Sequence, residues 1–555
     1  MLFTSSRFPI FIAFLILFSS CKNENNALEA ENTINSTDFE KHLITLSSDE
    51  FQGRKPFTIG EEKSVNYIAN EFKKMGIKGA YGDSYFQNVP LVELNFTPDD
   101  KISITTKDGE VVLEKTTDYI AKTPYLDDTV AIKNAEIIFA GYGIVAPEYN
   151  WNDYEGIDVK DKIVLVLVND PGFATQNPEL FKGNSMTYYG RWAYKYEEAA
   201  RQGAKGIMVI HATKPAGYGW QVLTNTSNSG ISLQAKDHNH SKCALEGWIT
   251  DKACKNLFEK AGLNFDELAE QAISNKFKAV SLNCDLNLTI KTELKFQNSK
   301  NVVGIIEGTE KADECIVYSA HWDHFGIGPK HNGDSIYNGA MDNGTALAAM
   351  LETAKAFANL KEKPKRSVVF LSVTAEETGM TGSAYYAENG LFPPEKTIAN
   401  LNYELLLPMG KMKDVTITGL GQSELDDYVA ESAKEQDRYI VEEAFPENGM
   451  YYRSDHFSFA KVGIPSLFIK GWQDSREHGK DWAKQQVKNY WATAYHKPAD
   501  EYNPETSDLE GCIEDAKLFF KIGYKLANED SYPTWNEKSE FKAIRDKSLL
   551  NLKKN

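Results

Sequence analysis

The second half of this 555-residue chain alternates apolar, strand-like runs with helix-length segments, and this pattern constrains the fold most. Strands separated by helices of this length favour a mostly parallel sheet with both faces covered. The sequence therefore predicts an α/β fold with a mixed, mostly parallel sheet. The predicted strands are 301–307, 314–320, 367–374, 398–405 and 464–469, and the predicted helices are 344–359, 382–389, 423–436 and 509–527.

Histidines and acidic residues stand at the ends of these strands or in the glycine-marked loops that follow them. An α/β sheet presents functional groups at the carboxyl ends of its strands. Two imidazoles with several carboxylates suit a borderline divalent metal ion, zinc first. We therefore predict a metal site built from His321, Asp323, Asp342, Glu376, Glu377, Glu404 and, from far along the chain, His496.

The spacing of these residues indicates different tasks. His321 and Asp323 are two apart on an extended segment and project to the same side, so one can bind metal while the other orients it. Asp342 follows a tight Gly-Ala turn and has two oxygens with which to bridge two ions. Glu376 and Glu377 are adjacent and point in different directions, which suits one ligand and one general base.

The length of the chain predicts its number of domains, and its net charge excludes one class of partner. A chain of 555 residues is too long for one ordinary core, so two or more domains are expected. The net charge of −18 leaves no basic surplus for phosphates and argues against nucleic acid as a partner. No C-x-x-C pair occurs, which disfavours a thiolate zinc site, and Cys243 and Cys254 are the nearest candidates for a disulfide.

The first twenty residues form a targeting segment. Arg7 supplies a positive charge and residues 8–18 form a short apolar region. Residues 18–21 resemble a bacterial lipobox, with Cys21 as the residue that would carry the lipid; a plain secretory signal is the competing interpretation. We expect an exported protein anchored to the outer membrane through lipidated Cys21, on either its periplasmic or its outer face.

The remaining chain divides by composition into consecutive regions. Residues 21–36 are polar and are interpreted as a flexible tether. Residues 135–290 contain their own strands and helix, which predicts a separate unit inserted into the rest. The regions around it are 37–134, with helical patterns and then short β-prone runs, 291–527, with the alternating pattern, and a charged tail, 528–555, in which Trp535 and Phe541 are candidate packing anchors.

Taken together, these motifs resemble those of the co-catalytic zinc aminopeptidases of metallopeptidase family 28, which includes bacterial aminopeptidases and glutamate carboxypeptidases. The resemblance covers about 301–527 and the N-terminal helices, and it implies a zinc-exopeptidase-like fold. Residues 135–290 resemble the protease-associated (PA) domain, a β-rich insert that many members carry.

The resemblance implies a role for each residue of the predicted site. The two zinc ions would share Asp342, with His321 on the first zinc and Glu377 and His496 on the second. Glu404 stands where the family usually has an aspartate on the first zinc, so that ion would shift or bind more loosely. The roles implied for the remaining residues are general base for Glu376, orientation of His321 for Asp323, and oxyanion stabilisation for Tyr495.

The activity implied is that of a metallopeptidase, in which a hydroxide bridging two zinc ions hydrolyses a peptide bond. An aminopeptidase is favoured, because an acidic pocket beside the metals can receive a free α-amino group. A carboxypeptidase or dipeptidase would need basic residues for the substrate carboxylate, and Arg453 is a candidate. A glutaminyl cyclase with one zinc and a non-catalytic binding protein that kept the fold are less favoured. The oligomeric state stays open.

Several further histidines of the chain are interpreted as background. His324, His331 and His478 are assigned to the surface. Residues 453–456 (Arg-Ser-Asp-His) resemble a family motif near the substrate pocket and suggest either a supporting role there or a buried Asp–His hydrogen bond.

Overall fold

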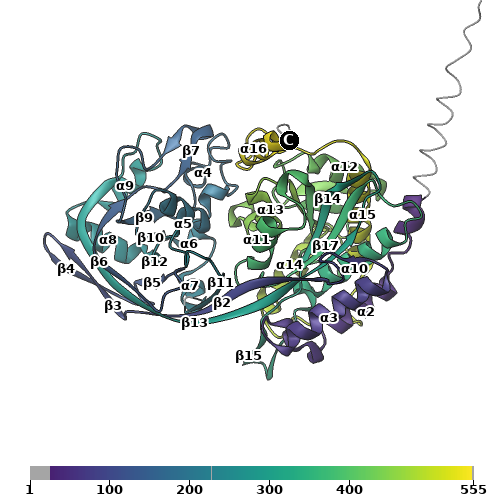
Figure 1. The fold of residues 1–555 in the computed structure, drawn as a ribbon. Coiled ribbons are helices and arrows are strands. Elements are labelled where there is room, and N and C mark those ends of the chain that lie inside the picture. The colour runs from purple at the N-terminus through teal and green to yellow at the C-terminus, as the bar shows by residue number, and fades with distance from the viewer. Residues whose placement is uncertain (1–25, 227, 553–555) are drawn as a thin grey trace, which may run out of the picture. The chain divides into compact units, whose positions relative to one another are not determined.

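The computed structural model describes residues 26–226 and 228–552, so the predicted signal segment and Cys21 lie outside the described residues. The chain divides into two compact units (Figure 1). The first, which we call the α/β unit, contains the chain up to Val89, Ser299–Glu442 and the chain from Ser454. The second, the β-rich unit, contains Pro90–Asn298 and Glu443–Arg453.

The α/β unit is built on a sheet with the strand order β20–β19–β21–β18–β14–β17–β13–β1. Strands β17, β14, β18 and β21 run parallel, and β13 and β19 flank them in antiparallel pairing. The predicted mixed, mostly parallel sheet is confirmed. Its strands are β1 (Lys78–Gly79), the end of β13 (Val280–Ile306), β14 (Lys311–His321), β17 (Arg366–Val373), β18 (Thr397–Asn402), β19 (Asp414–Ile417), β20 (Tyr439–Glu442) and β21 (Ser466–Lys470).

Alternate side chains of the central strands pack on opposite faces of this sheet. Tyr318 and Phe370 stack at 5.4 Å between ring centroids and belong to the core on one face, and Val317 and Val369 belong to the core on the other. Both faces are buried, which explains the continuous apolar runs in the sequence. The first face is covered by α2 (Ser36–Leu46), α3 (Ile59–Lys74), α10 (Thr345–Ala358), α12 (Leu425–Glu435) and α15 (Glu510–Asn528), and the second by α11 (Thr381–Asn389) and α13 (His456–Lys461) (Figure 1).

The predicted helices of this half agree with α10, α11, α12 and α15 to within two residues at each end. Helices α14 (Gly479–Thr493) and α16 (Lys542–Leu552), the strands β19 and β20, and the hairpin of β15 (Gly326–His331) and β16 (Asp334–Tyr337) were not predicted. In the charged tail, Trp535 and Phe541 are both buried, as expected of packing anchors.

The β-rich unit is larger than the predicted insert at 135–290, because strands before that range belong to its sheet and β13 continues beyond it. Strands β3 and β6 pair with β13, β5 pairs with β12, and β2 pairs with β11. Such pairing joins segments far apart in sequence, which composition does not reveal. The strands are β2 (Phe86–Pro98), β3 (Lys101–Thr106), β4 (Gly109–Glu114), β5 (Tyr119–Lys122), β6 (Thr129–Phe139), β9 (Ile163–Leu167), β10 (Gly206–His211), β11 (Ser229–Leu233), β12 (Leu245–Thr250) and the first part of β13, with the hairpin β7 (Val145–Ala146) and β8 (Trp151–Asn152).

The helices of the β-rich unit are short. Those of at least seven residues are α5 (Trp192–Arg201), α7 (Trp220–Thr226), α8 (Asp251–Ala261) and α9 (Phe265–Gln271). The disulfide considered between Cys243 and Cys254 is not formed, since both thiols are buried and free. Burial raises the pKa of the Cys243 thiol, which makes it a poor nucleophile.

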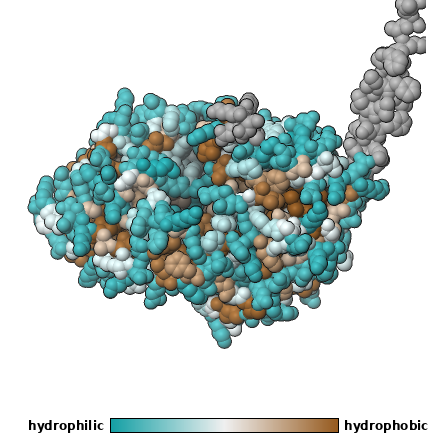
Figure 2. Space-filling model, viewed as in Figure 1, coloured by the Kyte–Doolittle hydropathy of each residue, from teal (hydrophilic) through white to brown (hydrophobic). Residues whose placement is uncertain are grey.

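The surface seen in Figure 2 is mostly hydrophilic, and its apolar residues are gathered in several small patches. This agrees with the charged composition of the chain. Among the described residues, no helix combines the length and the apolar character that crossing a membrane requires.

The contact between α15 and β14 leads to a stability prediction. A Cβ atom on Gly523 would lie 1.8 Å from the hydroxyl oxygen of Tyr318, which is fully buried and stacked on Phe370. Alanine gains about 1 kcal/mol over glycine in a helix, but overpacking a core costs about 1–3 kcal/mol or more. We expect Gly523→Ala to lower the free energy of unfolding by about 1–2 kcal/mol, measured by urea denaturation.

The double variant Gly523→Ala, Tyr318→Phe provides the control. It removes the oxygen at 1.8 Å and leaves the ring carbon Cζ at 2.6 Å, so part of the lost stability should return. A Gly523→Ala protein as stable as the wild type would show that this contact relaxes freely.

Candidate metal centre

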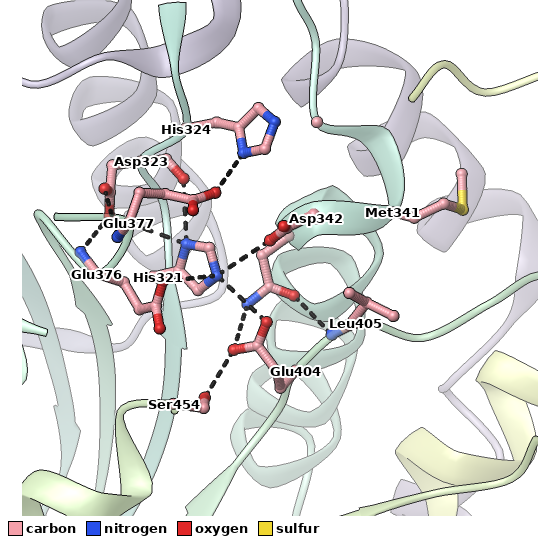
Figure 3. Close-up of polar contacts among 12 residues, drawn as sticks. His321, Asp323, His324, Met341, Asp342, Glu376, Glu377, Glu404, Leu405 and Ser454 are labelled. Atoms are coloured by element: carbon pink, nitrogen blue, oxygen red, sulfur yellow. Dashed lines mark hydrogen bonds and ion pairs between the residues drawn. The ribbon is translucent and has the colours of Figure 1, made fainter. Parts of the chain in front are cut away.

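Five side chains predicted as metal ligands, His321, Asp342, Glu377, Glu404 and His496, lie together at the carboxyl edge of the α/β sheet. His321 ends β14, Glu377 follows β17 and Glu404 follows β18. Asp342 lies in the η4 turn (Ala340–Gly344) that precedes α10, and His496 follows α14. We call these five residues the ligand cluster, and Figure 3 shows His321, Asp342, Glu377 and Glu404 of it.

His321 meets two carboxylates with one ring nitrogen. Its Nε2 atom lies 3.4 Å from Asp342 Oδ1 and 3.4 Å from Glu404 Oε1. Its other nitrogen, Nδ1, lies 3.1 Å from the backbone carbonyl oxygen of Asp323. A carbonyl on Nδ1 selects the tautomer that leaves Nε2 free to accept a metal ion.

His496 forms the same kind of group on the other side of Asp342. Its Nε2 atom lies 3.3 Å from Asp342 Oδ2 and 3.2 Å from Glu377 Oε2. Asp342 therefore turns one carboxylate oxygen toward each histidine. The arrangement contains two neighbouring sets of ligand atoms that share this one carboxylate.

The distances in these two sets fit a zinc ion. Two ligands at about 2.0–2.1 Å from zinc in a tetrahedral site lie about 3.3–3.4 Å apart, which is the spacing found here. The His496 Nε2 atom is buried, and no hydrogen-bond partner satisfies it among the described residues. Ligand atoms of His321, Asp342 and Glu377 also all lie within 4.8 Å of one another. The residues present thus fit the metal that their chemistry suggests.

The charges of the cluster depend on one another. Burial lowers the pKa of His496, but the carboxylates of Glu377 and Asp342 outweigh burial and raise it to about 10. Burial likewise opposes charge on His321, yet Glu404 and Glu376 raise its pKa well above the ordinary value. Both shifts favour the protonated imidazole, whereas a metal ion needs the neutral one, so metal binding should release protons and weaken as the pH falls.

Glu376 and Asp323 lie beside the ligand cluster. The Oε2 atom of Glu376 is 4.0 Å from His321 Nε2, and burial raises the pKa of this carboxyl well above its ordinary value. The carboxylate of Asp323 accepts hydrogen bonds from the backbone N–H groups of Glu376 at 3.0 Å and Glu377 at 3.4 Å. It also lies 3.8 Å from His321 Nδ1. Asp323 therefore fixes both glutamates, while its backbone carbonyl makes the closer contact with His321.

Glu404 has one oxygen fixed by a neighbour. Its Oε2 atom accepts a hydrogen bond from the Ser454 hydroxyl at 2.7 Å, and its Oε1 atom faces His321. The hydroxyl of Ser454 in turn accepts a hydrogen bond from Asn402 at 2.8 Å. The longer side chain is thus held so that a single oxygen points to the cluster.

The turn that carries Asp342 is held by Asp500, which was not predicted. The Asp500 carboxylate accepts hydrogen bonds from the backbone N–H groups of Met341 and Asp342, both at 3.0 Å. Burial raises the pKa of Asp500 to about 6. Gly339 has a φ of +57°, and a Cβ atom there would lie 2.2 Å from the Asp342 carbonyl oxygen, so only glycine fits this turn.

The assignment of His324 to the surface is wrong. Its side chain is buried, and its Nδ1 atom lies 2.5 Å from Glu377 Oε1. The signal in the sequence was its position, three residues after His321 and directly after Asp323. His331 and His478 are exposed, as expected.

Tyr495 is in contact with the ligand cluster, whereas the hydrogen bond considered within residues 453–456 is absent. The ring of Tyr495 stacks on that of His496, with 3.7 Å between centroids. Burial and then the charges of Asp342 and Glu377 raise the pKa of Tyr495 well above its usual value, so it stays protonated as a donor. The Asp–His hydrogen bond considered for Asp455 is not formed, because neither of its carboxylate oxygens has a hydrogen-bond partner among the described residues.

Comparison with known proteins gives partial matches to curated sequences. The chain is 30% identical over 126 residues to aminopeptidase NAALADL1 of Rattus norvegicus (22% of this chain, 15% of that protein). It is 28% identical over 251 residues to a probable glutamate carboxypeptidase of Arthroderma benhamiae (42% and 31%), and 30% identical over 190 residues to aminopeptidase YwaD of Bacillus subtilis (33% and 38%). The chain thus spans less than two fifths of the length of each of these relatives.

Among solved structures, an aminopeptidase from Aneurinibacillus sp. strain AM-1 aligns with a TM-score of 0.48 and 20% identity, over 91% of this chain and 97% of that one. The model of peptidase family M28 matches residues 301–518, which contain every residue of the ligand cluster. The similarity to peptidase family M28 thus lies in the segment that carries the metal centre.

Proposed function

We propose that this chain is a zinc-dependent exopeptidase, an aminopeptidase that binds two zinc ions and uses Glu376 as its general base. The observation that carries the proposal is the shared carboxylate. Asp342 turns one oxygen to His321 and the other to His496, at distances suited to ligands of a common ion. A structural ion pair would need one histidine; two histidines on opposite oxygens fit two metal sites.

In this proposal the first ion would be held by His321, Asp342 and Glu404, and the second by Asp342, Glu377 and His496. When bound there, zinc would polarise the scissile carbonyl and lower the pKa of water from about 15.7 toward ~7.

The protein's own groups supply the proton transfers and the orientation. Glu376 is buried beside His321, and its backbone N–H is fixed by Asp323. Its raised pKa suits a group that takes a proton from water and returns it to the leaving amine. Tyr495, stacked on His496, would donate its hydroxyl hydrogen to the developing oxyanion.

Changing the general base tests the mechanism. We expect Glu376→Gln to lower kcat by about 10²- to 10⁴-fold, because an amide cannot accept the proton. Zinc content, measured by elemental analysis, should stay at about two ions per chain, whereas the matched variant Glu377→Gln should lose zinc. Wild-type turnover in Glu376→Gln would refute the assignment of the base. A wild-type protein that binds no zinc would favour a non-catalytic binding protein.

Excess negative charge favours the aminopeptidase within this proposal. Asp342, Glu377 and Glu404 place three carboxylates in the centre against the ligand histidines His321 and His496. Asp323 and Glu376, whose pKa values are raised, add two more acidic groups beside them. Such a surplus attracts the ammonium group of a free N-terminus. The relatives with partial matches include both aminopeptidases and probable glutamate carboxypeptidases.

A carboxypeptidase would need basic residues for the substrate carboxylate, and the candidates are two arginines of the β-rich unit. Arg191 is 9% exposed and Arg453 is partly buried, and neither has an ion pair with a carboxylate in the described part of the chain. The Nε atoms of both are buried without a hydrogen-bond partner. Burial and the charge of Arg453 lower the pKa of Arg191 to about 9. Two guanidinium groups without a counter-charge suit a carboxylate ligand.

Substrates with a free or an acetylated amino group distinguish an aminopeptidase from a carboxypeptidase. We expect hydrolysis of amino-acid anilides, which have a free amino group and no carboxylate, and loss of hydrolysis when the amino group is acetylated. Arg453→Gln should leave anilide hydrolysis within about twofold of the wild type, because an anilide has no carboxylate for the guanidinium to bind. If acetylated peptides with a free carboxylate are cleaved instead, and Arg453→Gln raises their KM at least about tenfold, the carboxypeptidase assignment is correct.

We also propose that the protein is exported and anchored to the outer membrane through lipidated Cys21, from the apolar residues 8–18 and the lipobox-like residues 18–21. We expect Cys21→Ala to move the enzyme from the membrane fraction to the soluble fraction and to abolish incorporation of labelled fatty acid. Unchanged fractionation with no label in the wild type would favour the plain secretory signal.

A further inference from the structure

Arg54 is a fully buried cation whose hydrogen bonds all go to backbone carbonyls around the metal centre. Its Nε atom donates to Trp322 at 2.9 Å, and its terminal nitrogens donate to Asn338 at 2.6 Å and Gly339 at 2.8 Å. Further bonds reach the carbonyls of Leu46 at 2.8 Å and Asp342 at 3.4 Å. Burial lowers the pKa of Arg54 to about 10, so it remains charged at neutral pH.

Four of these five carbonyls belong to the two segments that carry His321 and Asp342, and the fifth, that of Leu46, ends α2. Trp322 directly follows the ligand His321, and Asn338 and Gly339 lead into the η4 turn that contains Asp342. The backbone carbonyl of Arg54 also accepts the N–H of His324 at 3.3 Å. A single planar guanidinium therefore spans the end of β14 and the η4 turn.

The η1 segment (Asp49–Arg54) is shaped for this close approach. Gly53 has a φ of +63°, and a Cβ atom there would lie 2.4 Å from the Tyr337 carbonyl oxygen and 2.7 Å from that of Gly326. The backbone of η1 is thus pressed against the loop between His321 and Asp342. Only glycine before Arg54 allows this contact.

We propose that Arg54 is a positioning residue that sets the spacing between His321 and Asp342 and thereby the zinc affinity of the centre. The proposal rests on the proposed function, in that the ligand cluster binds zinc. It adds a residue that touches neither metal nor substrate and acts through the backbone of both ligand-bearing segments.

Two effects of Arg54 on zinc binding have opposite signs. Its positive charge repels a metal cation, so removing the charge alone would strengthen binding. Removing the guanidinium also leaves five carbonyls without their donor and frees the two segments to move apart. The charge already faces Asp342, Asp500, Asp323 and Glu377, which offset it. We therefore expect the loss of spacing to dominate.

The test compares Arg54→Met and Arg54→Lys with Arg366→Met and Arg366→Lys. Arg366 is the matched control, because it is also fully buried in the α/β unit and donates to Glu314 at 2.7 Å and to the Leu526 carbonyl at 2.7 Å, outside the ligand cluster. Zinc affinity is measured by competition with a chelator, well below the unfolding temperature. The absorption spectrum of the cobalt-substituted protein reports the ligand geometry.

We expect both Arg54 variants to bind zinc about 10- to 100-fold more weakly than the wild type and to show an altered cobalt spectrum. Lysine keeps the charge but cannot span the five carbonyls, so Arg54→Lys should not restore wild-type affinity. The Arg366 variants should lose stability but keep zinc affinity within about twofold of the wild type.

Several results would overturn the inference. If the folded Arg54 variants bind zinc as tightly as the Arg366 controls, Arg54 is only a stabilising residue. Tighter binding in Arg54→Met would show that charge repulsion outweighs spacing. If Arg54→Met does not fold, Arg54→Lys gives the same measurement. A wild-type protein without zinc would instead refute the proposed function, which is a different outcome.

Discussion

The metal centre gathers five acidic side chains at one edge of the sheet, and the mutual repulsion of their carboxylates is the constraint on which the rest of its structure depends. Burial and the charge of Glu377 raise the pKa of Asp323 to about 7 despite the opposing effect of His321, which shows how costly a further negative charge is there. Positive groups therefore accompany these carboxylates. His321 and His496 belong to the cluster, and Arg54 donates a hydrogen bond to the Asp342 carbonyl oxygen. These cations leave a surplus of negative charge, and a divalent metal ion between the ligand atoms would neutralise it.

The η4 turn is where the parts of the centre meet. Asp500 accepts its N–H groups, Arg54 donates to its carbonyls, and Asp342 extends its two oxygens toward the two histidines. A turn with donors and acceptors bound on both sides has little freedom to move. The bridging carboxylate is therefore pre-organised by contacts that come from distant parts of the chain.

The pairing of Glu404 with Ser454 gives a physical account of the departure from the aspartate that the family usually has. The added methylene extends the carboxylate, and the Ser454 hydroxyl holds one of its oxygens at 2.7 Å. The remaining oxygen then meets His321 at the same 3.4 Å as Asp342 does. Glutamate is thus accommodated at this position because a hydroxyl fixes its longer side chain.

The sequence by itself determined the parallel core and the ligand types. Apolar runs such as those of β14 and β17 predict buried strands from local composition, and the chemistry of His321, Asp342, Glu377, Glu404 and His496 at their ends predicts a metal site. Only the tertiary structure decided the rest. His324, Asp500 and Arg54 act through contacts between segments far apart in the chain. The β-rich unit begins at Pro90 because the early strands β2, β3 and β5 pair with β11, β13 and β12. Local patterns carry no record of which distant segments meet, and that is the physical reason for the difference.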